Sequence, residues 1–253
     1  MRAKRGALGA PGFCRYTEAM PLTRRAFGRR VLAGLTATTL VGNGGCSSSD
    51  VGATDAGAGG TGGGGGGNGC ILYPQQTEGP FYLDLDSLRR DITEGKAGMP
   101  LSVIVQVQSE SCAPLKDVAV DVWHCDADGL YSGFTGQLGG IDTTGETFLR
   151  GTQVTDADGV AEFESIYPGW YPGRTTHIHF KVHTSSTTEA TSQLYFPEEV
   201  TAGIYATSPY DARGPKDTPN ATDGIANANP APLAMVSGDE ESGFVAMIAV
   251  TVA

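Results

Sequence analysis

The chain has 253 residues and a formal net charge of −11. The first 46 residues hold eight of the 17 Lys and Arg but one of the 28 Asp and Glu, so the remainder has nine basic and 27 acidic residues and a net charge of −18. A remainder this acidic repels phosphate groups, which excludes nucleic acid as an expected partner.

Residues 21–46, PLTRRAFGRRVLAGLTATTLVGNGGC, have the layout of an export signal. Four arginines precede a short apolar run from Val31 to about Val41, and small residues follow. This run is too short to cross a membrane as a helix. The string TRRAFGR resembles a twin-arginine signal. We therefore expect residues 1–46, with Met20 as an alternative start, to direct export to the periplasm or cell envelope.

Cys46 ends this segment and is a candidate for lipidation, which would tether the protein to a membrane as a lipoprotein. Cleavage nearby without lipidation is the alternative, because Asn43 stands where lipoproteins have an aliphatic residue. Residues 47–69 are glycine-rich and predict a flexible linker. The folded domain is therefore expected over residues 70–253, which is long enough for one hydrophobic core.

Three cysteines, Cys70, Cys112 and Cys125, fall in this domain. In an oxidising compartment they predict one disulfide and one spare thiol, although their spacing does not identify the pair. The absence of a CxxC-type pair in the sequence disfavours a zinc site.

Alternating and β-branched runs predict strands along most of the domain. These runs are residues 101–107, 118–123, 147–155, 160–166, 177–183, 193–196 and 244–252. The first two are joined by a Pro-containing loop and predict a hairpin or neighbouring strands. The DADG strings at 126–129 and 156–159 predict hairpin turns.

Helical patterns are weak throughout the domain. Residues 85–94 predict at most a short turn of helix, and residues 197–240 predict a long, mostly irregular segment with a functional or interface role. Many short strands with Gly- and Pro-rich turns are typical of an all-β sandwich.

The string His177-Ile178-His179 is the first candidate site. On a strand both imidazoles emerge on one face, whereas Ile178 shares the opposite, core-facing side with Phe180 and Val182. Two imidazoles on one face can bind one metal ion, and a polar strand face without metal is the alternative reading.

Two further histidines extend the alternatives. His183 also shares the imidazole face and is expected to be solvated or to support the ligands, and His124 is expected to be structural. A copper or zinc hydrolytic site built from all four histidines is a further alternative. It leaves the nearby tyrosines unexplained.

Tyr131 follows the first DADG turn, and Tyr171 lies in the turn PGWYPG just before the two histidines. A free phenol has a pKa near 10, so only a hard and highly charged cation binds its phenolate at neutral pH. Ferric iron fits this requirement better than zinc or ferrous iron. The common ferrous arrangement would also require a carboxylate ligand, which residues 168–183 lack. Packed aromatic side chains with satisfied hydroxyls are the alternative reading.

Four segments in order, TEGPFYLD, VDVWHCDADGLYS, PGWYPGRTTHIHF and SQLYF, resemble the intradiol ring-cleavage dioxygenases, which include catechol and protocatechuate dioxygenases. The resemblance covers about residues 77–196 and is greatest to an exported branch of the family. It implies an all-β fold, a β-sandwich of the intradiol dioxygenase type with long irregular loops.

The resemblance also implies a mononuclear Fe(III) site. By position, Tyr131, Tyr171, His177 and His179 match the four iron ligands of the family. Tyr171 and His179 would be axial, and Tyr131 and His177 equatorial. A hydroxide or water would complete the coordination.

The resemblance further implies that the enzyme uses O2 to cleave a catechol-type ring between its two hydroxylated carbons, giving a muconate-type diacid. Tyr171 would leave the metal and take a substrate proton, and Arg174 would stabilise charge that develops on the substrate. Gln193 matches a glutamine near the bound substrate. Tyr171 and Arg174 are thus the expected catalytic residues, and Gln193 and Arg174 the expected substrate contacts.

Two departures from the family pattern leave the substrate and the oligomeric state open. The signal and linker stand where catechol dioxygenases have a helical dimerisation segment. Thr175 and Thr176 stand where Pro-Ala is usual. The alternative function is a non-catalytic, transthyretin-like envelope module that binds sugars or proteins, since TDADGVAEF resembles such modules. A module of that kind requires neither the two tyrosines nor the histidine pair.

Overall fold

The computed structural model of the chain describes residues 70–185 and 189–253. The predicted export signal, the lipidation of Cys46 and the glycine-rich linker all lie outside these residues. Within the described ranges, no helix has the length and apolar character needed to cross a bilayer.

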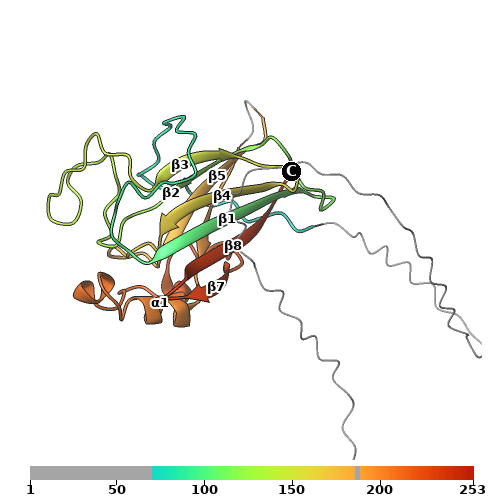
Figure 1. Cartoon of the computed structure of the whole chain (residues 1–253). Coiled ribbons are helices and arrows are strands. Elements are labelled where there is room, and N and C mark those ends of the chain that lie inside the picture. The colour runs from blue at the N-terminus through green and yellow to red at the C-terminus, as the bar shows by residue number, and fades with distance from the viewer. Residues whose placement is uncertain (1–69, 186–188) are drawn as a thin grey trace, which may run out of the picture. The chain divides into compact units, whose positions relative to one another are not determined.

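Eight strands and three short helical segments make up the described domain (Figure 1). The strands are β1 (Pro100–Ser109), β2 (Ala119–Trp123), β3 (Arg150–Val154), β4 (Val160–Ile166), β5 (His177–His183), β6 (Glu189–Tyr195), β7 (Met235–Asp239) and β8 (Gly243–Val252). The helical segments are α1 (Glu198–Ile204), η1 (Tyr210–Arg213) and η2 (Asn220–Thr222).

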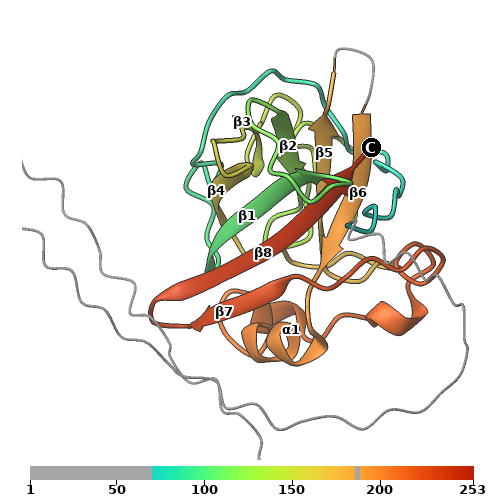
Figure 2. The same ribbon diagram turned by 90° about the vertical axis from the view of Figure 1, so that its right-hand side faces the viewer.

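The strands form two four-stranded sheets, which confirms the predicted all-β sandwich. One sheet has the order β4-β1-β8-β7 and the other the order β3-β2-β5-β6. Neighbouring strands are antiparallel except β1 and β8, which run parallel. Figure 2 shows β1 and β8 side by side, with β5 and β6 in the layer behind them.

The core lies between the two sheets and follows the alternation of the sequence. In β1 every second side chain is buried, and in β5 Ile178, Phe180 and Val182 are fully buried in the same cluster, as predicted. Burying one such side chain contributes roughly 1.5–3 kcal/mol. The core-facing residues of β1, β2, β5 and β8 include Val103, Val105, Val107, Val120, Val122, Ile178, Phe180, Val182, Ala246, Ile248 and Val250.

The predicted hairpins are wrong in their pairing. β1 and β2 lie in different sheets, because β1 is already paired on both edges by β4 and β8. The turn at 156–159 does form, since the amide of Gly159 donates to the carbonyl of Asp156 at 3.0 Å. It nevertheless joins β3 of one sheet to β4 of the other. The turn at 126–129 also forms, but it leads into a loop and not into a strand.

Two segments outside the main strands agree with the sequence-based expectation of local structure. Residues 85–94 contain no helix and make isolated bridges through Leu88 and Asp91 to the two sheets. The segment 197–240 is mostly irregular, as expected, and it contains α1, two short 3-10 helices and the edge strand β7. Both views place α1 close to β7 at one end of the sandwich (Figures 1 and 2).

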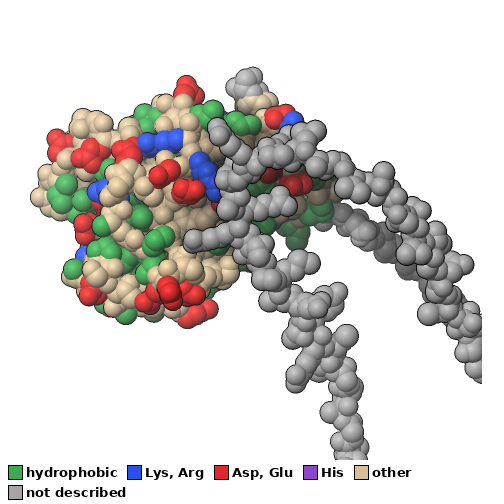
Figure 3. All heavy atoms as spheres, viewed as in Figure 1, with side chains coloured by type: hydrophobic (Ala, Val, Ile, Leu, Met, Phe, Trp, Pro, Cys, Tyr) green, Lys and Arg blue, Asp and Glu red, His purple; other side chains and the backbone are tan. Residues whose placement is uncertain are grey.

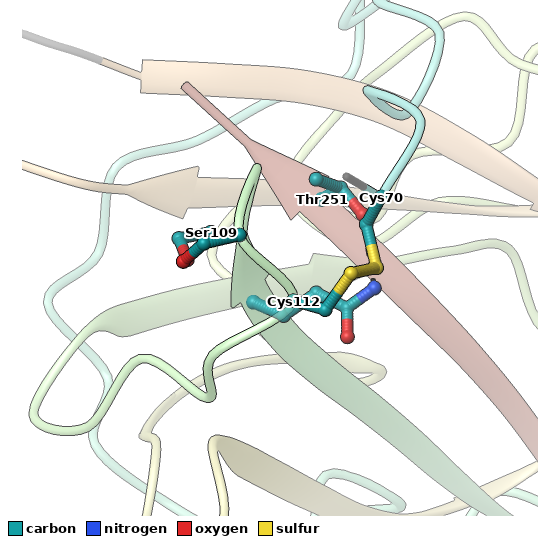
Figure 4. Close-up of a disulfide and its surroundings, with 6 residues drawn as sticks. Cys70, Ser109, Cys112 and Thr251 are labelled. Atoms are coloured by element: carbon teal, nitrogen blue, oxygen red, sulfur yellow. Dashed lines mark hydrogen bonds between the residues drawn. A yellow bond between two sulfur atoms is a disulfide. The ribbon is translucent and has the colours of Figure 1, made fainter. Parts of the chain in front are cut away.

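The cysteines behave as predicted. Cys70 and Cys112 form a disulfide with a Cα–Cα distance of 5.3 Å, and Cys125 is a buried free thiol. Figure 4 shows that the disulfide joins the beginning of the described domain to the loop after β1, close to Thr251 of β8.

The face of the domain that Figure 3 shows is acidic in character, as the composition predicts. Figure 3 shows Asp and Glu side chains spread over the visible face, with fewer Lys and Arg among them. Such a surface keeps a protein soluble and disfavours binding to phosphate-rich polymers.

Candidate metal centre

β5 is buried on both of its faces, which is unusual for a strand that carries polar side chains. One face packs into the core, and the other presents His177, His179 and Lys181 away from it. Residues 76–82, the covering segment, lie over this outer face: Glu78 pairs with Lys181, and Gly79 passes close to His179. The histidines are therefore shielded from water without entering the core. The predicted division of β5 into a core face and an imidazole face is confirmed.

Four donor atoms meet over this outer face. The Nε2 atom of His177 lies 3.1 Å from Nε2 of His179, 3.1 Å from the phenol oxygen of Tyr171 and 3.4 Å from that of Tyr131. Nitrogen and oxygen ligands lie about 2 Å from a bound metal ion, so ligands at right angles are about 3 Å apart. The spacing of these four atoms fits a common ion.

A backbone hydrogen bond holds His177 in the form that binds metal, whereas Nδ1 of His179 is buried without a hydrogen-bond partner. The carbonyl of Thr175 accepts a hydrogen bond from Nδ1 of His177 at 2.6 Å, so Nε2 presents its lone pair to the other three donors. Burial lowers the pKa of His177 to about 3 and that of His179 well below its usual range. Both imidazoles are therefore neutral at pH 7, as metal ligation requires.

The phenols need a cation to ionise. Burial raises the pKa of Tyr131 well above its usual value, and burial raises that of Tyr171 to about 12 although Arg174 opposes the change. A highly charged metal ion is the agent that can offset this desolvation. The donor set of two phenols and two neutral imidazoles therefore fits Fe(III).

Aromatic rings and one glycine fix the orientation of these ligands. Phe81 stacks on Tyr131 with ring centroids 4.4 Å apart, and Trp123 stacks on His179 at 5.0 Å. Gly79 has a φ of +71°, and a Cβ at this position would lie 3.3 Å from Cε1 of His179. The glycine thus allows the covering segment to pass close over the imidazole.

The backbone of Tyr131 is held by a side chain that sequence reasoning missed. The amide of Gln137 accepts from the backbone N–H of Tyr131 and donates to its carbonyl, each at 2.8 Å. Thr143 donates to the same carbonyl at 2.7 Å. Both residues lie in a glycine-containing loop without periodicity, so no sequence signal marks them.

Arg174 lies beside the four donors. Its Nη1 atom is 3.5 Å from Nε2 of His177, and its Nη2 donates to the amide oxygen of Gln193 at 2.5 Å. Gln193 is fully buried and donates in turn to the carbonyl of Thr77 at 2.9 Å. The structure therefore joins Gln193 to Arg174, while the contact of either residue with substrate stays a prediction.

Comparison with known proteins gives one consistent result. A family model described as Dioxygenase matches residues 77–202. The intradiol ring-cleavage dioxygenase from Tetranychus urticae is 29% identical with a TM-score of 0.67, covering 72% of this chain and 94% of that protein. The dioxygenase domain of a carbohydrate-binding fusion from Streptomyces sp. SirexAA-E is 30% identical with a TM-score of 0.53, covering 72% and 98%. The chain belongs to the intradiol ring-cleavage dioxygenase family.

The curated relatives agree with this membership over a shorter region. A chlorocatechol 1,2-dioxygenase from Cupriavidus pinatubonensis is 29% identical over 140 residues, which is 47% of this chain and 52% of the relative. The chain thus spans about half the length of the curated relatives it matches. Both the family and the fold predicted from the four segments are confirmed.

The other histidines of this intradiol family member do not join the donor cluster. Nδ1 of His124 donates to the carbonyl of Cys125 at 2.8 Å, and Ser165 donates to its Nε2 at 2.7 Å. His183 pairs with Asp121 at 2.9 Å and Glu189 at 3.2 Å. The described residues contain no group of three or more His, Cys, Asp and Glu placed to hold a metal. The four-histidine alternative therefore has no geometric support.

Replacing His124 by Gln is expected to flatten the pH dependence of stability. Burial lowers the pKa of His124 to about 4, against about 6.5 for an unfolded histidine. Below pH 6.5 the unfolded chain binds a proton that the folded chain rejects, so the free energy of unfolding falls until about pH 4. The loss is about 1.4 kcal/mol per pH unit for this group and is absent above pH 6.5.

Urea unfolding of the metal-free protein between pH 7 and pH 4 measures this effect. His124→Gln should show the shallower decline, because it removes one of the groups that titrate only on unfolding. Equal slopes for the two proteins would contradict a neutral His124 in the fold.

Proposed function

We propose that this protein is a non-haem Fe(III) dioxygenase that cleaves a catechol-type ring between its two hydroxylated carbons. The observation that carries the proposal is the approach of Tyr131, Tyr171 and His179 to within 3.4 Å of Nε2 of His177. Family membership supports the same chemistry. A binding module has no need to bring two phenols and two imidazoles to one point.

The substrates are a catechol and O2, and the product is a muconate-type diacid. The carbon–carbon bond between the hydroxylated carbons breaks, and both oxygen atoms of O2 enter the product. Tyr131, Tyr171, His177 and His179 would hold a ferric ion, which would supply the Lewis-acid and one-electron chemistry that makes the catechol ring reactive toward O2.

The two tyrosines have different environments and hence different roles. Tyr131 is 1% exposed and lies between Phe81 and the loop that holds its backbone, so it remains fixed. Tyr171 is only partly buried and lies in a turn. Its phenol oxygen is the one that can move away from the cluster and receive a proton from a substrate hydroxyl. No separate carboxylate base is required.

Arg174 supplies the positive charge beside the donors. Its guanidinium is held through Nε and Nη2, and Nη1 faces the cluster. A fixed cation at this position stabilises negative charge that develops on the substrate oxygens as the ring reacts. The surroundings of the cluster are largely apolar and aromatic, so this charge is weakly screened.

Purified, iron-loaded protein tests the proposal. Ferric phenolates absorb visible light, so we expect a red protein with one iron per chain and oxygen uptake with catechol, protocatechuate, hydroxyquinol or a chlorocatechol. Hydroquinone is the matched control, because its para hydroxyls cannot both reach one ion. A colourless iron-loaded protein, or one that consumes no O2 with any catechol, would favour the envelope-module alternative.

We also propose that the protein is exported to the periplasm or cell envelope. Residues 21–46 support this through their resemblance to a twin-arginine signal, and the Cys70–Cys112 disulfide supports it because such bonds persist in oxidising compartments. Cell fractionation of the native chain and of an Arg24→Lys, Arg25→Lys variant tests export. Radiolabelled fatty acid, with Cys46→Ala as the control, tests lipidation.

A further inference from the structure

Asp223 is a buried carboxylate in the long segment 197–240, far in sequence from the four donors. It is 0% exposed, and its Oδ2 accepts from Nε of Arg174 and from the backbone N–H of Thr175, each at 2.8 Å. Its Oδ1 accepts from the backbone N–H groups of Ile225 and Ala226, each at 2.8 Å. Four donors therefore hold this carboxylate in one orientation.

These contacts also fix the guanidinium of Arg174. Asp223 holds Nε, and Gln193 holds Nη2 at 2.5 Å. A planar group that is held at two of its corners cannot turn about its own axis. Nη1 is the corner that faces Nε2 of His177, at 3.5 Å. Its direction toward the donor cluster is thus set by the other two contacts.

Further hydrogen bonds attach the segment that carries Asp223 to Thr175, the residue that follows Arg174. Nζ of Lys216 donates to Oγ1 of Thr175 at 2.6 Å, and Thr175 donates through this hydroxyl to Asn220 at 2.6 Å. Thr175 stands where the sequence analysis noted a departure from the family. A proline there would offer neither the N–H to Asp223 nor the hydroxyl.

The charge balance favours an ionised pair. Burial acts to raise the pKa of Asp223, but hydrogen bonds from the backbone of Ala226 and Thr175 and from Arg174 outweigh it, so the pKa is lowered. A buried arginine that loses its carboxylate partner keeps its charge and seeks another acceptor. Nε2 of His177, 3.5 Å from Nη1, is such an acceptor within its reach.

We propose that Asp223 is the positioning residue for Arg174 and that segment 197–240 folds back to carry it there. The inference deepens the proposed function and rests on it. Asp223 does not touch the donor atoms. It sets where the arginine charge acts when the substrate reacts.

The test compares Asp223→Asn, Arg174→Lys and the double variant, each loaded with iron. Asp223→Asn should lower kcat at least tenfold with a smaller change in KM, and it should leave the visible absorption of the resting protein unchanged. In the Arg174→Lys background, Asp223→Asn should lower kcat less than twofold, because the guanidinium that Asp223 positions is already absent. Asp211→Asn is the matched control, since Asp211 is an exposed acid of the same segment.

A second measurement does not depend on turnover. In NMR spectra of the metal-free protein, the Nε–H signal of Arg174 is identified by its absence in Arg174→Lys. This Nε–H proton should exchange with solvent slowly in the native chain and quickly in Asp223→Asn. If Asp223→Asn does not fold, Asp223→Glu replaces it in the test, because glutamate keeps the negative charge but moves the carboxylate. Asp223→Glu should show the same loss of kcat with an intact visible absorption band.

Native kcat in an active Asp223 variant would overturn the inference, and so would a full and additive loss in the Arg174→Lys background. Loss of the visible band in Asp223→Asn would also overturn it, because the residue would then act on the ligands. A native protein that consumes no O2 with any catechol contradicts the proposed function itself. In that case unchanged exchange of the Arg174 signal in Asp223→Asn would separately reject the positioning role.

Discussion

Tyr131→Phe is expected to remove most of the visible absorption of the iron-loaded protein and to lower kcat/KM by at least about 100-fold, as for loss of one essential polar group in an active site. Tyr131 is the enclosed phenol, with its oxygen 3.4 Å from Nε2 of His177. Under the proposed function, the metal would then lose the anionic ligand that stays in place while Tyr171 moves.

Tyr131→Phe tests the role of the phenol oxygen specifically, because it leaves the other contacts of this residue in place. The phenylalanine ring keeps the stacking contact with Phe81, and Gln137 still bonds the backbone at this position. The fold should therefore survive, which circular dichroism and thermal unfolding can check. Tyr167→Phe is the matched control. Its phenol is equally buried but bonds to Thr201 at 2.7 Å, away from the donor cluster.

The outcomes separate ligation from packing. Loss of colour in Tyr131→Phe with unchanged colour in Tyr167→Phe assigns the band to the clustered phenol. An unaltered band in iron-loaded Tyr131→Phe would exclude Tyr131 from the ligand set and would leave Tyr171 as the only phenolic ligand of the proposed four.

The donor cluster could be predicted because its parts are short-range features of the sequence. Alternation in β5 places His177 and His179 on one face, and a Pro- and Gly-bounded turn brings Tyr171 close in sequence. Tyr131 comes from a separate loop, and only the resemblance to the family joined it to the others. The structure brings all four within reach of a common ion.

The pairing of strands could not be predicted in the same way. A DADG turn depends on local bonds, such as the Oδ1 atom of Asp156 accepting from the amide of Asp158 at 2.9 Å. Such bonds fix the direction of the chain over four residues. They do not decide which sheet the next strand joins, because that depends on which strand edges remain unpaired in the assembled sandwich.

Asp223 and Gln137 were missed for a related reason. Each lies in a segment without hydrophobic periodicity and acts on a residue that is far away or is reached through a loop. A carboxylate in an acidic chain looks like a solvated surface group, and only its burial marks it as different. The length of segment 197–240 indicated a functional or interface role, but which of its residues acts is visible only after folding.

Removal of the disulfide by Cys70→Ser and Cys112→Ser together is expected to lower the free energy of unfolding by about 4 kcal/mol, from the entropy of closing a loop of this length. The two cysteines are separated by 42 positions, and the loop between them includes β1 and the segment that covers the donor cluster. The double variant avoids an unpaired thiol that could form bonds between molecules.

The visible band should nevertheless survive this change under native conditions. The covering segment has its own attachments beyond Cys70, since the backbone N–H of Gln76 donates to the carbonyl of Thr191 at 2.9 Å and Glu78 pairs with Lys181 at 3.0 Å. Urea unfolding with and without a reducing agent measures the effect, and the reductant should not affect the double variant. Loss of colour in the folded double variant would contradict this account, because it would show that the disulfide, and not the local bonds, holds Phe81 and Gly79 over the ligands.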